Sequence, residues 1–187
     1  MSHKKHLIVL SSPSGGGKTT LAKHLMKIRP ELKFSISATT RKKRTNEKEG
    51  KDYYFLSKDE FAEKIKNNDL VEYEEIFGNY YGTPRSEVER NLHNNNILIF
   101  DVDVKGALNL KELYPEESLL IFVSPPDIDT LKNRLKNRKT ESSEEIDIRL
   151  KRAEMEMKLS EDFDEIVIND KLENAFKDIE KIAEKYL

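Results

Sequence analysis

The sequence contains no cysteine and only 7 glycines in its 187 residues. Without cysteine there can be no disulfide framework, thiolate metal site or cysteine nucleophile, and nothing favours secretion. It also lacks any apolar run near the roughly 20 residues that a membrane-spanning helix needs, and Leu7–Leu10 is too short for the core of a signal peptide. We therefore expect a cytoplasmic protein without a membrane partner.

The sequence also lacks an excess of charge of either sign, although charged residues make up 36% of it. Lys and Arg total 33 and Asp and Glu total 35, so the net charge at neutral pH is −2. A protein that binds nucleic acid without sequence preference needs an excess of positive charge, so we expect no nucleic-acid partner. Any anion-binding site must come from a local cluster of basic groups.

Short apolar runs alternate with helical patterns along the chain. Helical periodicity covers Thr19–Arg29 and recurs from Leu172 to Ala183. Runs typical of strands buried on both faces are Leu7–Leu10, Ile97–Val102, Leu119–Val123 and Ile166–Ile168. The alternation predicts an α/β fold in which helices flank both faces of a parallel sheet, with ligands at the carboxyl ends of its strands.

Two segments interrupt this alternation, and the chain length fits a single domain. Residues 35–83 combine a charged stretch with short alternating runs, which predicts a small inserted β lobe whose helix starts at the capping box of Ser57. Residues 125–158 alternate arginine and glutamate with thin apolar support, which predicts a helical flap with little core of its own. The core of the domain would then comprise residues 1–34, 84–124 and 159–187.

A phosphate-binding loop follows the first predicted strand directly. Its glycines let successive backbone N–H groups point inward, Lys18 can reach β- and γ-phosphates, and the hydroxyl of Thr19 can bind Mg²⁺. The candidate ATP-binding residues here are Ser12, Pro13, Ser14, Gly15, Gly16, Gly17, Lys18, Thr19 and Thr20. The loop departs from the strict pattern only at Ser12, where glycine is usual, and Thr20 excludes a dinucleotide fingerprint. The alternative is an ordinary glycine-rich turn.

Further candidates lie in the inserted lobe and after the second predicted strand. Arg41 and Arg44 lie near Tyr53 in sequence, a combination suited to a phosphate monoester, although a solvated charged loop is the alternative. The run Asn79–Pro84 predicts a turn with Pro84 at the first position of a helix. Asp101 and Asp103 follow an apolar strand, where alternation directs both to one side; their alternative role is to cap the next helix.

At this point the sequence resembles a known family. The basic segment matches the signature of the guanylate kinases at every fixed position, in Thr39-Thr-Arg-x-x-Arg-x-x-Glu-x-x-Gly-x-x-Tyr-x-Phe55. Asn79-Tyr-Tyr-Gly-Thr83 resembles that family's second nucleotide-binding segment. The resemblance continues through Arg134-Leu-x-x-Arg138, Glu144 and Arg149-Leu-x-x-Ala153, so it covers essentially the whole chain.

The resemblance implies a P-loop NTPase-type core, a mixed β lobe that binds GMP, a helical lid, and Mg²⁺-dependent transfer of the γ-phosphoryl group of ATP to GMP. It assigns the catalytic roles to Lys18, Arg44, Arg138 and Arg149, and Mg²⁺ binding to Thr19 with waters and phosphates. For ATP it adds Arg134, Arg138 and Asn169 to the phosphate loop. For GMP it implies Ser37, Arg41, Arg44, Tyr53, Glu72, Tyr81, Thr83, Asp101 and Asp103, with Asp101 nearer the metal and phosphates.

The chemistry of Glu72 is consistent with this implication. Guanine presents N1–H and N2–H₂ as adjacent donors that one carboxylate can accept, whereas adenine offers an unprotonated N1 there. Without the resemblance, Glu72 could equally be the polar face of a strand over Leu70–Ile76. Two rival functions are an inactive guanylate-kinase-like interaction module and another small-molecule kinase. The presence of Lys18, Arg138 and Arg149 argues against the first rival, and the basic segment argues against the second. The sequence carries no signal for oligomeric state.

Overall fold

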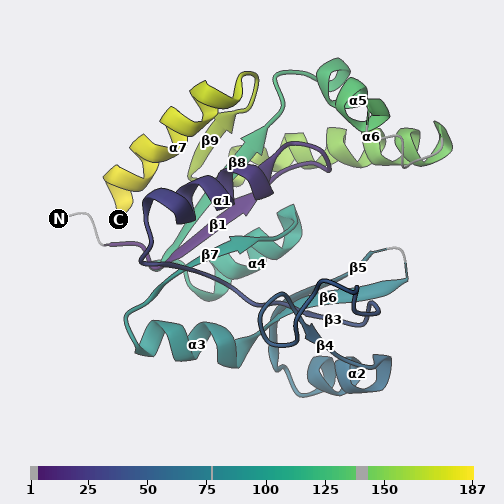
Figure 1. The fold of residues 1–187 in the computed structure, drawn as a ribbon, viewed down its shortest axis with the longest axis vertical. Helices are drawn as coiled ribbons and strands as arrows, with labels where there is room; N and C mark the ends of the chain where they lie inside the picture. The colour runs from purple at the N-terminus through teal and green to yellow at the C-terminus, as the bar shows by residue number, and fades with distance from the viewer. Residues whose placement is uncertain (1–3, 77, 138–142) are drawn as a thin grey trace.

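The computed structural model describes residues 4–76, 78–137 and 143–187. Among them, five strands form one parallel sheet in the order β2-β7-β1-β8-β9, which confirms the predicted α/β fold (Figure 1). The strands are β1 (Leu7–Ser11), β2 (Leu32–Phe34), β7 (Ile97–Asp101), β8 (Ser118–Ser124) and β9 (Glu165–Ile168). β1 lies in the middle of the sheet and is entirely buried, which fits its apolar run Leu7–Leu10 and includes the polar Ser11 at its end.

Helices cover both faces of this sheet. α1 (Lys18–Ile28) and α7 (Leu172–Tyr186) pack their apolar stripes on one face, where residues such as Leu25 and Ile179 are buried with Ile8 of β1. α3 (Arg85–His93) and α4 (Val104–Leu113) cover the other face. Each described helix is too short or too polar to span a membrane.

The inserted lobe contains a second sheet with both parallel and antiparallel pairs, in the order β4-β3-β6-β5. Its strands are β3 (Ala38–Thr39), β4 (Tyr54–Phe55), β5 (Leu70–Ile76) and β6 (Asn79–Pro84). α2 (Lys58–Lys66) begins at the predicted capping box, where Ser57 Oγ accepts from Glu60 N and Glu60 Oε2 accepts from Ser57 N. Phe61 of α2 is fully buried against this sheet.

The predicted flap, residues 125–158, is the segment that the family resemblance identifies as the lid, and it is called the lid below. It contains α5 (Ile128–Asn137) and α6 (Ser143–Lys158), and the short helix η1 (Leu159–Asp162) follows it. The expectation that it has little core of its own is wrong. Its helices bury a separate apolar cluster between them: Leu131, Leu135, Ile146, Leu150 and Ala153. In the sequence these apolar residues alternate with arginines and glutamates. The apolar stripe on each helix is therefore short, and the charged composition of the segment hides it. Arg138 lies outside the described residues.

Three further details correct the sequence analysis. Asn79–Pro84 is not a turn but strand β6, and Pro84 is the cap before α3 because its ψ of 130° is extended rather than helical. β2 was not predicted, because it is only three residues long and Phe34 is exposed. In β9, Ile166 and Ile168 are about half exposed, since this strand lies at the sheet edge and only the face of Val167 is well covered.

Candidate active site

The phosphate loop connects the buried strand β1 to α1, in the context that its sequence predicts. Gly17 is the N-cap of α1 with φ of 101°, a left-handed conformation that disfavours any residue with a Cβ. An added Cβ there would also come within 2.3 Å of Asn169 Nδ2. The side chain of Asn169 is held in this place because its Nδ2 donates to the Gly16 carbonyl at 2.7 Å. Asn169 thus contacts the loop backbone from the end of β9.

The unusual Ser12 fits into the loop because of Gly16. Ser12 is buried, and its Oγ donates to the Pro13 carbonyl at 2.9 Å. A Cβ at position 16 would lie 2.8 Å from both Cβ and Oγ of Ser12. The loop therefore accommodates a serine at its first position only where the residue facing it is glycine.

Lys18 and Thr19, at the start of α1, both contact Asp101 at the end of β7. Lys18 Nζ lies 3.2 Å from Asp101 Oδ1, and Thr19 Oγ1 donates to Asp101 Oδ2 at 2.6 Å. The exposed Thr20 follows in the first turn of α1. The loop lysine, the candidate metal-binding hydroxyl and one of the two predicted aspartates thus form one cluster at the carboxyl edge of the sheet.

A cavity of about 230 Å³ opens beside this cluster, between the main sheet and the lobe. It is lined by most of the residues predicted to bind the acceptor nucleotide. Those lining residues are Ser37, Tyr53, Glu72, Tyr81, Asp101 and Asp103, together with Lys18 from the loop. Asp101 and Asp103 both face it, as the strand alternation predicts. Lys18 borders both the phosphate loop and this cavity, so a donor bound to the loop and an acceptor in the cavity would meet there.

Glu72 is the most deeply buried carboxylate of the cavity, at 6% exposure. It faces Thr83 across the antiparallel pair of β5 and β6, and Thr83 Oγ1 donates to Glu72 Oε1 at 2.6 Å. Burial, reinforced by the charge of Asp103, raises the pKa of Glu72 to about 7, although the Thr83 hydrogen bond opposes the shift. Glu72 and Thr83 thus form a buried polar pair. The other carboxylate oxygen of Glu72, Oε2, lies next to Gly106 in the first turn of α4.

The sequence analysis missed Gly106 in that first turn. Asp103 caps α4 by accepting from the backbone N–H of Gly106, so its capping role and its place at the cavity coexist. A Cβ on Gly106 would lie 2.9 Å from Glu72 Oε2 and 3.0 Å from Asp103 Oδ1. Only glycine therefore lets the helix approach both carboxylates. The signal in the sequence was the spacing of Asp103 and Gly106, which fits a helix cap equally well.

The basic segment is ordered by a carboxylate within its own signature. Both nitrogens of the Arg41 fork donate to Glu47, at 2.7 and 3.1 Å, and this pairing raises the pKa of Arg41 and lowers that of Glu47. The Arg41 guanidinium also lies 5.4 Å from the centre of the Tyr53 ring. Arg44 is exposed and donates its backbone N–H to Glu47. Arg41 thus lies next to Tyr53, which lines the cavity, whereas Arg41 and the exposed Arg44 are not among the lining residues.

Two of the predicted lid arginines, Arg149 and Arg134, contact the phosphate loop and the residue that supports it. Arg149 of α6 donates through Nη1 to Ser14 Oγ at 2.6 Å, which brings a guanidinium to the loop. Arg134 of α5 donates through Nη2 to the carbonyl of Asn169 at 2.7 Å. Among the described residues, Arg134 therefore contacts the loop only through Asn169, whose side chain donates to the Gly16 carbonyl. Arg152 and Glu74 were not predicted to have any role, yet they join the lid to the lobe beside the cavity.

No group of three or more metal-binding side chains occurs within the described residues. Thr19 and Asp101 do bring a hydroxyl and a carboxylate together, and oxygen ligands of this kind are those that Mg²⁺ prefers. A site with so few protein ligands fits a metal whose remaining ligands are phosphates and waters.

Comparison with known proteins places this geometry in a family. The sequence model described as guanylate kinase matches residues 4–186. The chain belongs to the guanylate kinase family. A guanylate kinase of Salinibacter ruber is 45% identical over 175 residues, which span 93% of this chain and 93% of that protein. A guanylate kinase of Lactobacillus johnsonii is 43% identical over 185 residues, or 98% of this chain and 90% of the relative.

A solved guanylate kinase structure has the same fold. The crystal structure of the guanylate kinase from Anaplasma phagocytophilum matches with a TM-score of 0.75 and 32% identity, over 98% of this chain and 86% of that one. The family relationship therefore includes the core, the lobe and the lid together, which confirms the resemblance inferred from the motifs.

Proposed function

We infer that this chain has the activity of its family and transfers the γ-phosphoryl group of ATP to GMP or dGMP, giving ADP and GDP. The observation that carries the inference is the position of Lys18. It belongs to the phosphate loop and also lines the acidic cavity that contains Glu72. Donor and acceptor phosphates bound on either side of this lysine would be in reach of one another. The product GDP assigns the enzyme to guanine nucleotide recycling and GTP supply.

On the donor side, the backbone of the phosphate loop, from Ser12 to Thr20, binds the phosphates of ATP. Lys18 neutralises charge on the β- and γ-phosphates. Thr19 holds Mg²⁺ together with waters and phosphates, and Asp101 lies within hydrogen-bond distance of Thr19. When bound, Mg²⁺ supplies positive charge that offsets the charge of the phosphoryl oxygens. Asn169 supports the loop and faces the adenine side.

On the acceptor side, Arg41, Arg44, Tyr53 and Tyr81 bind the phosphate of GMP. Arg41 exchanges its contact with Glu47 for a phosphate oxygen, or binds both, since its fork has donors to spare. Ser37, Glu72, Thr83 and Asp103 recognise guanine. Glu72 accepts from the base in its ionised form, and binding of the two guanine donors favours that form over the protonated one.

The transfer needs no covalent intermediate on the protein. Phosphoryl transfer through a loose transition state is accelerated mainly by in-line positioning and by neutralisation of the equatorial oxygens. Lys18, Arg44, Arg138 and Arg149 supply that positive charge, and Arg134 and Arg138 bind ATP from the lid. The lid of residues 125–158 and the lobe of residues 35–83 close over the substrates, because water must be excluded if ATP is not to be hydrolysed. We retain a cytoplasmic location as part of this proposal.

The test is a coupled assay of ADP release with ATP, Mg²⁺ and each of GMP, AMP, CMP and UMP. We expect turnover with GMP and little with the others. The variant Lys18→Ala, purified in the same way, controls for contaminating kinases. Binding of GMP without turnover would instead support the inactive interaction module, and equal turnover with another nucleotide would overturn the assignment of the acceptor.

A further inference from the structure

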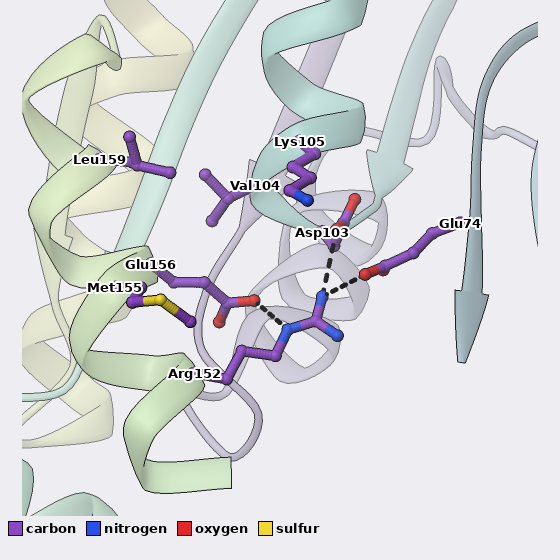
Figure 2. A pocket seen from close by; sticks show the side chains of 8 residues that line it. All are labelled: Glu74, Asp103, Val104, Lys105, Arg152, Met155, Glu156 and Leu159. Atoms are coloured by element: carbon purple, nitrogen blue, oxygen red, sulfur yellow. Dashed lines mark hydrogen bonds and ion pairs between the residues drawn. The ribbon is translucent and has the colours of Figure 1, made fainter. Parts of the chain in front are cut away.

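Arg152 lies in the middle of the lid helix α6, and its guanidinium contacts three parts of the molecule (Figure 2). Its Nη2 donates to Glu74 Oε1 on β5 of the lobe at 2.6 Å and to Asp103 Oδ2 at the start of α4 at 3.2 Å. Its Nε donates to Glu156 Oε1, one turn further along α6, at 2.7 Å. A single side chain of the lid thus joins both the lobe and the core.

The two carboxylates that Arg152 joins also form part of the acceptor cavity. Glu74 and Asp103 line the cavity that contains Glu72, and they line a second cavity of about 350 Å³ on the lid side. They therefore form a wall shared by the two cavities. Arg152 contacts this wall from the lid side. Glu156 accepts from Arg152 Nε on the side of the guanidinium opposite Glu74 (Figure 2).

Charge explains why this wall needs a cation. Burial and the nearby carboxylate of Asp103 raise the pKa of Glu74, whereas Arg152 opposes that rise. Asp103 Oδ1 already accepts from the backbone N–H of Gly106 at 2.8 Å, so the guanidinium binds its other oxygen. The carboxylates of Glu74 and Asp103 both contact Arg152 Nη2, so they are close enough to repel each other unless a cation lies between them.

The other charged groups around the wall cannot replace Arg152. Glu156 on α6 adds a further negative charge, and its pKa is raised mainly by its own burial. Lys105 on α4 lines the lid-side cavity but is exposed. Lys18 on α1 lines the acceptor cavity, where its ammonium pairs with Asp101. Of these groups, only Arg152 contacts both carboxylates of the wall at once.

We propose that Arg152 is a positioning residue for the acceptor base, which ties the lid to the lobe by holding Glu74 and Asp103 in place. This inference rests on the proposed function, because the base in question is that of GMP. Arg152 itself touches neither the phosphate loop nor Glu72 in the described contacts, so it acts through the two carboxylates. It makes the shape of the acceptor cavity depend on the position of α6.

The test measures KM for GMP, KM for ATP and kcat for the full chain and for Arg152→Ala, Arg152→Lys and the control Lys151→Ala. Lys151 is the exposed neighbour on the same helix. We expect Arg152→Ala to raise the KM for GMP on the order of tenfold, in line with coupling energies between contacting charged groups. The KM for ATP and kcat should each change by less than about threefold, because Arg152 makes no described contact with the phosphate loop. Arg152→Lys should rescue only partly, because a single ammonium cannot hold two carboxylates with the geometry of a fork.

Two further readouts separate positioning from a merely structural ion pair. In the background Glu74→Gln, Arg152→Ala should raise the KM for GMP much less, because no second carboxylate remains to repel Asp103. The defect of Arg152→Ala should also be smaller near pH 6 than near pH 8, since protonation of Glu74 relieves the repulsion. If Arg152→Ala does not fold, the comparison of Arg152→Lys with Glu74→Gln gives the same information.

A fall in kcat with an unchanged KM for GMP would show that Arg152 serves the transferring phosphate and would overturn the proposal. Equal changes in both KM values, together with a lower Tm, would reduce Arg152 to a structural tie and overturn it as well. The proposed function fails separately, if the unmodified chain does not phosphorylate GMP. An active chain whose Arg152→Ala variant keeps normal constants contradicts this inference alone.

Discussion

The two halves of the active site are constructed on opposite principles. The phosphate loop is a run of consecutive residues, Ser12–Thr19, in which backbone geometry and the absence of Cβ atoms decide what can bind. The acceptor cavity is assembled from side chains on β5, on β7 and its following turn, and on several parts of the lobe. At Gly16 and Gly17 of the loop, an added Cβ would come closer than 3 Å to Ser12 and to Asn169 respectively, so these two positions favour the absence of a side chain. In the cavity, the identity of each polar side chain matters and the backbone is only a support.

The largest expected effect comes from Lys18→Ala, because this lysine borders both halves. We expect kcat to fall by about 10³-fold or more, as removal of a charge that neutralises the transferring phosphoryl group should do. Affinity for GMP should change far less, since the proposed function assigns the ammonium to the phosphates of the donor. Steady-state kinetics and GMP binding by calorimetry would check this, with Lys23→Ala on the exposed side of α1 as a control. An equal loss of GMP affinity would erase the distinction between the two halves.

Arg149→Ala tests whether the lid belongs to the donor half. Arg149 contacts Ser14 of the loop, so its loss should lower kcat by about 10²- to 10³-fold with a smaller change in the KM for GMP. Arg149→Lys should restore little, because a point charge cannot replace the planar fork. The measurement is kcat for both variants beside their Tm. A normal kcat with a lower Tm would make Arg149 a structural residue.

Glu72→Gln sharpens the comparison on the acceptor side. The amide nitrogen of glutamine would face guanine donors, so the preference for GMP over AMP should narrow by about 10²-fold, within the range for sites built on hydrogen bonds. Turnover with both nucleotides gives the ratio, and the KM for ATP is the internal control. An unchanged ratio would mean that Glu72 does not recognise the base.

Glu72 should also make stability depend on pH. Folding raises its pKa from an ordinary value of 4.5 to about 7, so between these values the folded state binds more protons than the unfolded state. The free energy of unfolding should therefore fall as pH rises from about 5 to 8, by at most about 3 kcal/mol. Urea unfolding of the unmodified chain and of Glu72→Gln over this range would check the sign. Parallel curves would contradict the assignment.

The smallest effect is expected within the loop, where Gly16→Ala would clash with Ser12. We expect a loss of about 1–3 kcal/mol in the free energy of unfolding, typical of overpacking. Adding Ser12→Gly should recover part of it, but not all, because the new Cβ also lies 3.1 Å from the Pro13 carbonyl. Ser12→Gly alone is the control and should leave activity near normal. Full additivity of the two changes would show that these residues do not compete for the same space.

The same contrast explains what the sequence could predict. Four strands of the main sheet, β1, β7, β8 and β9, and the phosphate loop are contiguous patterns, so the sequence pattern alone revealed them. β2 and β6 were missed because one is very short and the other contains Gly82 and Pro84, which read as a turn. Local sequence grouped Arg41 and Arg44 with Tyr53, and Asp101 with Asp103. Only the resemblance to a family joined these groups to one another and to Glu72, because they are separated by tens of positions. Arg152 was missed because its pairing with Glu156, one turn away, looks like any solvated helix pair.

The phosphate loop lies near the start of the chain, yet it is held by a residue that the ribosome adds much later. Asn169 donates to the Gly16 carbonyl across 153 positions, and β1 pairs on both sides with strands from the second half of the sequence. A nascent chain therefore carries the loop without the partners that give it shape until synthesis has passed β9. We therefore expect nucleotide to bind tightly only after nearly the entire domain has assembled, as a ligand of the finished fold and not a guide to its formation.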